Sequence, residues 1–294
     1  MLKNVLFTLA LIIYGLGLTT FLLVLRFPVD DFLGYVSAQV EEKTQRFSLS
    51  IEDVSYRYPL TLDFSGVTLV DKRSDLNLPV DQLTLRPDLS SPTTRFFVGL
   101  TTIGARLDSL VRIEDGWQSI DMSDISLSGL DVQRVADLFA LLDRRITGLF
   151  SFTGSFRGAV TNFKGGSLRG QWRLTEAAIG LKRPILATEE LTFSELASTM
   201  EMRDGVITIR DGTAAGSQFF GEFNGMVRLG RQWELSVLDI GGELQAHEEY
   251  IAQNELAAQA LTLLYRKYNS RALPIQVYGT ILAPEFRFGP VETM

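Results

Sequence analysis

The sequence predicts a mainly β protein with a few helices: an N-terminal transmembrane helix, then an elongated, curved antiparallel β-sheet with two longer helices inserted. Three features lead to this prediction. Residues Val5 to Leu25 are almost continuously apolar, apolar and polar residues alternate from Phe47 onward, and tight-turn signals separate the alternating runs. The expected parts are a signal anchor (1–27), a juxtamembrane amphipathic helix (28–46) and a water-side β-rich domain (47–294).

The apolar run is long enough to cross a bilayer. No charge interrupts it between Lys3 and Arg26, and a helix of about 20 residues spans the roughly 30 Å hydrocarbon core. The rival interpretation is a cleaved signal peptide, which has a shorter apolar region and ends at small residues. Because the end of this run, from Leu23 to Phe27, is bulky, we expect a retained anchor. A short positive N-terminal tail predicts a cytoplasmic N-terminus and a domain on the far side.

The β-rich part follows from turns and period-two alternation. Asp115-Gly116 and Asp204-Gly205 are strong turn signals, and short strands joined by tight turns pair antiparallel. Two helices interrupt the strands, one beginning after Asp131 and one from His247 to Tyr268. They are too few to cover a whole sheet. The apolar face must therefore be covered by curling into a trough, by sandwiching, or by something outside the chain.

Composition excludes several classes of function. The net charge of −7 argues against nucleic-acid binding, which needs a basic surface. The absence of cysteine excludes disulfides, thiolate metal sites and a thiol nucleophile. The only histidine, His247, lies beside two glutamates at a predicted helix start, and no nucleophile or phosphate-binding motif is present. We therefore expect a non-enzymatic protein without cofactor or metal.

What remains informative is a repetitive sheet with one apolar face. Such a sheet can contact another protein, or it can curl and shield an acyl chain from water. The candidate residues for an apolar groove or contact face are Phe150, Phe152, Phe156, Leu168, Trp172, Leu174, Phe223, Trp233 and Leu235. An open groove favours lipid binding, and a closed core favours protein contact.

The order of these segments is similar to a known family. An anchor is followed by Phe27-Pro28 and a short helix, then by IEDVSYRYPLTLDFSGVTLVD, a glycine-punctuated GLFSFTGSFRG, GGSLRGQWRL, a long helix and a closing LPIQVYGTILAPEFRF. This pattern resembles protein N of the bacterial type II secretion system (general secretion pathway protein N) in its single-anchor form, which is itself similar to AsmA-like envelope proteins. The most specific part is YGTILAPEF, Tyr278 to Phe286.

The resemblance implies a bacterial inner-membrane protein with one membrane pass and its AsmA-like main domain in the periplasm. It implies an accessory role in type II protein secretion, with the membrane and other secretion-system subunits as partners and no nucleic acid. The alternative is a short AsmA-like protein that binds or transfers phospholipid in an apolar groove. Neither family supplies catalytic residues to carry over.

Overall fold

The computed structural model describes residues 14–15, 34, 38, 47–57, 60–71, 76–116, 118–138, 145–160, 162–186, 188–232 and 235–289. The predicted anchor and juxtamembrane helix lie almost wholly outside these residues and stay predictions. Within the described residues, none of the helices is both long and apolar enough to cross a membrane.

The described chain is mainly β and antiparallel, as predicted. Its fifteen strands form one sheet, and the hydrogen-bonded order follows the sequence except that β2 (Asp53–Arg57) pairs only with β3 (Thr61–Asp71). The apolar face is therefore not covered by a second sheet. The chain divides into two compact units, 1–84 and 85–294, with the boundary inside β4 (Leu76–Pro87).

The first unit is built around β3. The first half of β3 pairs with β2, and its second half pairs with β1 (Phe47–Ser50). These pairings put β1 and β2 end to end along one side of β3. The buried apolar side chains of this unit are Val54, Phe64, Val67 and Val80.

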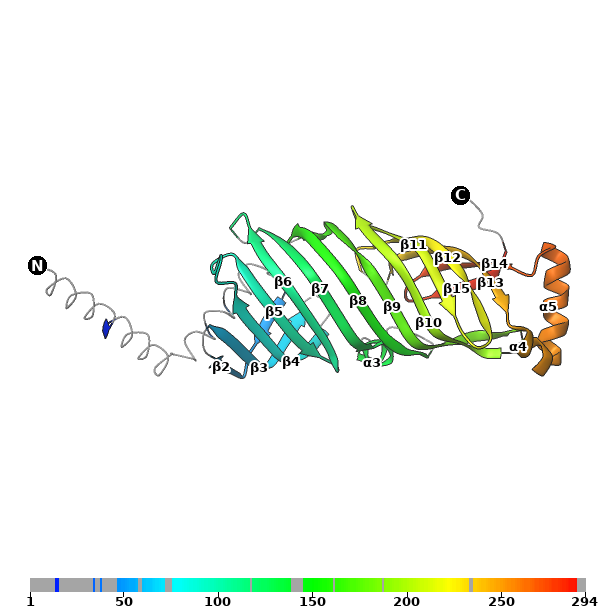
Figure 1. Cartoon of the computed structure of the whole chain (residues 1–294), viewed down its shortest axis with the longest axis horizontal. Coiled ribbons are helices and arrows are strands. Elements are labelled where there is room, and N and C mark those ends of the chain that lie inside the picture. Colours follow the sequence, from blue (N-terminus) through cyan, green and yellow to red (C-terminus); the bar gives the residue numbers. More distant parts are fainter. Residues whose placement is uncertain are drawn as a thin grey trace, which may run out of the picture. The chain divides into compact units, whose positions relative to one another are not determined.

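The second unit is an antiparallel meander in which each strand pairs with its predecessor. Its strands are β5 (Arg95–Thr102), β6 (Ala105–Glu114), β7 (Ser119–Asp131), β8 (Ile146–Ala159), β9 (Asn162–Ile185), β10 (Thr188–Arg203), β11 (Val206–Ala215), β12 (Phe219–Arg228), β13 (Val237–Ala246), β14 (Leu273–Thr280) and β15 (Pro284–Phe288). Figure 1 shows β5 to β10 running diagonally side by side.

The described helices begin where the sequence predicts them. Helix α3 (Val132–Leu138) joins β7 to β8, and the Asp131 carboxylate caps its start by accepting from the backbone N–H of Gln133 at 3.0 Å. The helix expected as one piece from His247 to Tyr268 is two, α4 (Glu248–Gln253) and α5 (Glu255–Tyr268). Asn254 causes the break: its backbone is extended, and its side chain accepts from the N–H of Ala257 to start α5.

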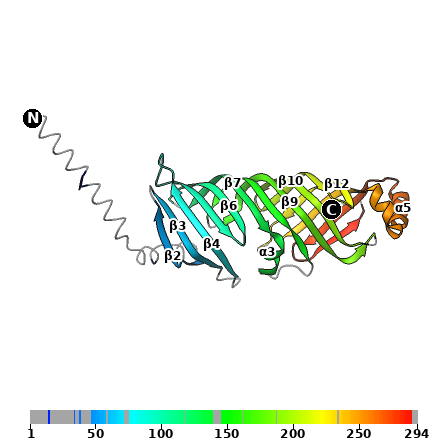
Figure 2. The same ribbon diagram turned by 60° about the horizontal axis from the view of Figure 1, so that its bottom comes forward.

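The second unit covers its apolar face by curling. In Figures 1 and 2 the red C-terminal strands lie across from the green strands β8–β10. Bulges help, since an extra residue in one strand bends it and increases its twist. At one of them the register of β11 against β12 shifts between Ile209 and Gly212, and Asp211 adopts φ 52°. Helices α4 and α5 lie at the end of the unit beyond β13 (Figure 1).

Candidate functional site

The curled part of the second unit forms a half-open apolar cavity of about 450 Å³, within the range of roughly 300–1,000 Å³ typical of ligand sites. Residues from every strand between β8 and β15 line it. They are Ile146, Trp172, Ile179, Leu181, Leu191, Phe193, Leu196, Ile209, Ala214, Glu222, Phe223, Leu238, Ile240, Leu244, Ile275, Val277, Ile281, Pro284, Glu285 and Phe286. Since β8–β10 and β14–β15 line the same space, the cavity exists only because the sheet curls.

Strand alternation explains why these side chains point inward. On β13, the side chains of Leu238, Ile240 and Leu244 line the cavity. Val237, the first residue of this strand, is exposed. Successive side chains of a strand point to opposite faces, so one face of β13 forms wall and the other faces solvent.

Helix α5 packs beside this space. Ala257 and Leu261 are fully buried and belong to the same apolar cluster as Leu244, Leu273 and Ile275. The preceding helix is held to the sheet by the Tyr250 hydroxyl, which donates to the Leu186 carbonyl at 3.0 Å. Burial raises the pKa of Tyr250. The helices therefore pack on strand residues such as Leu244 and Ile275 that also line the cavity.

The neighbouring part of the sheet is filled by its own side chains. Phe152 and Phe156 are buried with Ile125 and Met202 in a second apolar cluster. The Phe156 ring stacks on the ring of Phe163, with centroids 4.2 Å apart and planes 9° apart. This region resembles a closed core rather than an open groove.

Trp172 lies at the junction between the filled region and the cavity. Its ring stacks on Phe150 with centroids 6.2 Å apart and lies 6.1 Å from the ring of Phe223. Its indole N–H is buried and has no hydrogen-bond partner among the described residues. Trp172 thus links the two apolar clusters and forms part of the cavity wall.

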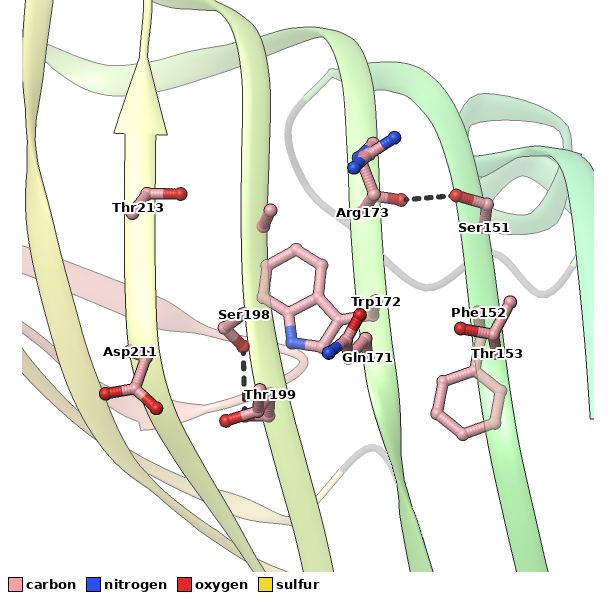
Figure 3. Close-up of a pocket in the computed structure, with 11 residues that line it drawn as sticks. Ser151, Phe152, Thr153, Gln171, Trp172, Arg173, Ser198, Thr199, Asp211 and Thr213 are labelled. Carbon is pink, nitrogen blue, oxygen red and sulfur yellow. Dashed lines mark hydrogen bonds between the residues drawn. The ribbon is translucent and has the colours of Figure 1, made fainter.

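Trp172 also lines a shallow polar hollow of about 300 Å³ over β8–β11. Figure 3 shows the indole in the gap between two strands, beside Ser198, its directly opposed residue on β10. The Ser198 hydroxyl donates to the Thr199 carbonyl at 3.2 Å. Most other side chains in this hollow are small and polar, so it offers few apolar contacts.

The charged side chains that line the cavity in the described chain are all acidic. Glu222 and Glu285 are its only charged lining residues in the described chain, and no cation lines it. A hydrogen bond to the Glu285 carboxylate raises the pKa of the Tyr278 phenol. The described residues contain no group of three or more side chains arranged to hold a metal ion. The cavity is therefore suited to uncharged, apolar groups.

The opposite face of the sheet carries cross-strand ion pairs. Arg157 Nη2 lies 2.7 Å from Glu114 Oε2, and Arg169 Nε lies 3.0 Å from Glu201 Oε1. Hydrogen bonds from Arg203 and Arg169 lower the pKa of Glu201. These exposed ion pairs make the outer face of the sheet polar, in contrast to the apolar inner face.

The residues predicted for the groove fall into separate places. Phe150, Phe152, Phe156, Leu168 and Trp172 lie together in the filled cluster, with only Trp172 also lining the cavity. Leu174 and Phe223 pack against the other cluster, and Phe223 lines the cavity. Leu235 is 51% exposed and lines neither space. Trp233 lies outside the described residues.

Sequence reasoning missed the far wall of the cavity. Leu238, Ile240, Ile275, Val277 and Phe286 lie on predicted strands, but alternation alone does not tell which distant strands face them. The alternation of apolar and polar residues could have identified these positions, because it places them on the apolar faces of their strands.

Comparison of the chain with protein-family models, with curated proteins and with solved structures finds no match.

Proposed function

We propose that the chain is a non-enzymatic, inner-membrane-anchored accessory component of a type II protein secretion system, with its main domain in the periplasm. The sequence resemblance supports this proposal, and its most specific segment forms a structural element. Tyr278–Phe286 spans the end of β14, a tight turn and the start of β15. Gly279 has φ 93°, and the Thr280 hydroxyl accepts from the N–H of Ala283 at 3.1 Å.

A small exposed apolar patch beside this turn carries the proposal. Leu235, Val237 and Leu282 are each more than 40% exposed. Their backbones adjoin, because Ile281 N–H donates to the Ser236 carbonyl at 3.0 Å and Val237 pairs with Thr280. Exposed apolar patches mark protein contacts when they gather at one place. We call these three residues the turn patch and assign it to contact with another secretion subunit.

Replacement of the chromosomal copy tests this role. We expect Leu235→Asp to reduce export of secreted proteins into the medium, because a charge at the centre of an apolar contact opposes docking. Leu256→Asp is the matched control, since Leu256 is 68% exposed on α5, away from the turn patch. Both variants must accumulate to equal levels. Unchanged export in a strain lacking the protein altogether would overturn the proposal.

The cavity favours a second candidate function, a short AsmA-like protein that binds an acyl chain. Native mass spectrometry of the detergent-purified full chain would detect a retained lipid. Val277→Trp fills the cavity from β14, and Val237→Trp makes the same change on the exposed face of β13. We expect the first variant to lose the lipid and the second to keep it, with circular dichroism confirming that both fold. Absence of lipid from the unsubstituted chain would count against this function.

A further inference from the structure

The apolar cavity has room for a limited length of hydrocarbon. An apolar cavity of about 150 Å³ holds one benzene molecule, which corresponds to roughly 25 Å³ for each of its carbon atoms. At that packing, the space of about 450 Å³ between β8 and β15 holds roughly 18 carbon atoms. This is the size of one long acyl chain, and it is too small for the two chains of a diacyl lipid.

The wall of the cavity suits a chain of methylene groups. Apart from Glu222 and Glu285, every lining residue in the described chain is aliphatic or aromatic. Both glutamates are exposed to solvent, so the interior is lined by apolar side chains. Burying a polar group without a hydrogen-bond partner in such an interior is costly. The polar end of an occupant therefore stays at the open side of the cavity.

The neighbouring part of the sheet offers no room for a second chain. Phe156 is 2% exposed and Met202 is 5% exposed there, so the side chains of this cluster already fill the space between the strands. Trp172 lies at the junction with the cavity, and its ring stacks on that of Phe150 and lies beside that of Phe223. Hydrocarbon in the cavity therefore cannot extend past Trp172 without displacing packed side chains.

We propose that the cavity is a single-chain site, whose ligand class is a lipid with one linear acyl chain of up to about 18 carbons. This inference rests on the second function proposed above, the binding of an acyl chain, and adds the number and the length of the chains. A lipid with two chains would leave one of them in water. Each methylene left in water lowers the affinity roughly fourfold.

A series of monoacylglycerols tests the length limit. The full chain is kept in a steroid-based detergent, which has no linear chain to compete for the cavity, and native mass spectrometry counts the bound probes. An equimolar mixture contains chains of roughly 12 to 24 carbons, on both sides of the expected limit. Chains within the limit move from hydrocarbon to hydrocarbon and should bind about equally. Each further methylene should lower the bound fraction roughly fourfold.

Two substitutions in the wall should move the limit in opposite directions. Val277→Phe adds about four side-chain carbons to the lining and should shorten the limit by about four carbons. Ile240→Ala removes about three and should lengthen the limit by about three. Val237→Phe makes the first change at an exposed position of β13 and should leave the limit in place. Circular dichroism identifies any variant that fails to fold.

The number of chains is tested with monopalmitoylglycerol and dipalmitoylglycerol, which share the same chain and an uncharged head. The two-chain probe should bind at least about tenfold more weakly, because it leaves the micelle with one chain in water. Equal binding of the two probes would overturn the single-chain site, as would a length limit that stays in place in both wall variants. Failure of every probe to bind would instead contradict the acyl-binding function itself, and the inference would fall with it.

Discussion

In the filled part of the sheet, two glycines leave the space that a phenylalanine ring occupies. Gly154 lies directly opposite Gly170 on the neighbouring strand, and the Phe152 ring lies over both. A Cβ added at Gly154 would lie 2.7 Å from Cζ of Phe152 and would also strike the Arg169 carbonyl. The glycines are needed here for the space that they leave, because the aromatic ring occupies the place of two side chains.

Gly154→Ala should therefore lower the free energy of unfolding by about 1–3 kcal/mol, as other overpacked cores do. Gly289→Ala is the control, since a Cβ there would meet only the Tyr268 hydroxyl at 3.8 Å. Thermal unfolding by circular dichroism would separate the two, at about 2–4 °C per kcal/mol for chains of this size range. Equal midpoints for both variants would contradict this account of the glycine.

At the scale of elements, helix α5 is anchored by a narrow buried stripe. Leu261 is fully buried, whereas Leu263, two residues further, is 67% exposed. The helix thus packs on the apolar cluster beside the cavity through one face only. Its start depends on the Asn254 side chain.

Leu261→Ala should cost about 2–5 kcal/mol, the range for removing a buried leucine. Leu263→Ala should change stability by no more than about 0.5 kcal/mol, because it removes solvent-exposed atoms. Chemical denaturation of the two variants would measure the difference. If Leu263→Ala were the more destabilising, the orientation of α5 on the sheet would be wrong.

The strands and helices also show which parts of the fold could be predicted from the sequence. Period-two alternation is a local signal, and it correctly predicted antiparallel strands such as β6 and β8. The curl depends on long-range pairing and on bulges at ordinary-looking residues: Asp124, Glu176 and Asp211 all have positive φ without being glycine. Helical periodicity runs through Asn254 and hides the break between α4 and α5. The sequence therefore predicted an apolar groove or a closed core as alternatives, and it named Trp172 and Phe223 of the cavity wall but not the strands that form the far wall.

At the scale of the whole molecule, the two compact units have separate stabilising features. In the first unit, Asp63 accepts from the Thr84 hydroxyl at 2.6 Å and forms an ion pair with Arg57. Burial alone raises the pKa of Asp63, but the hydrogen bonds from Thr84 and Arg57 outweigh it and lower the pKa below its usual value. The ionised carboxylate is thus favoured by folding.

This shift predicts acid sensitivity in the first unit. A lowered carboxyl pKa contributes stability above the ordinary value of about 3.9, and that stability is lost as pH falls through the folded pKa. Amide hydrogen exchange in β2 and β3 should accelerate at about pH 3 relative to about pH 6, after correction for intrinsic rates. Asp63→Asn should remove most of this dependence, while peptides from β9 serve as the internal control. An unchanged pH dependence in the variant would assign the effect to other groups.

The cavity wall is shared by eight strands, β8 to β15, that are far apart in the sequence. Each of them contributes at least one lining side chain, so a substitution in any one strand changes the same space. The volume of about 450 Å³ is therefore a property of the pairing of the whole curled segment, and a change in the register of one strand would alter it.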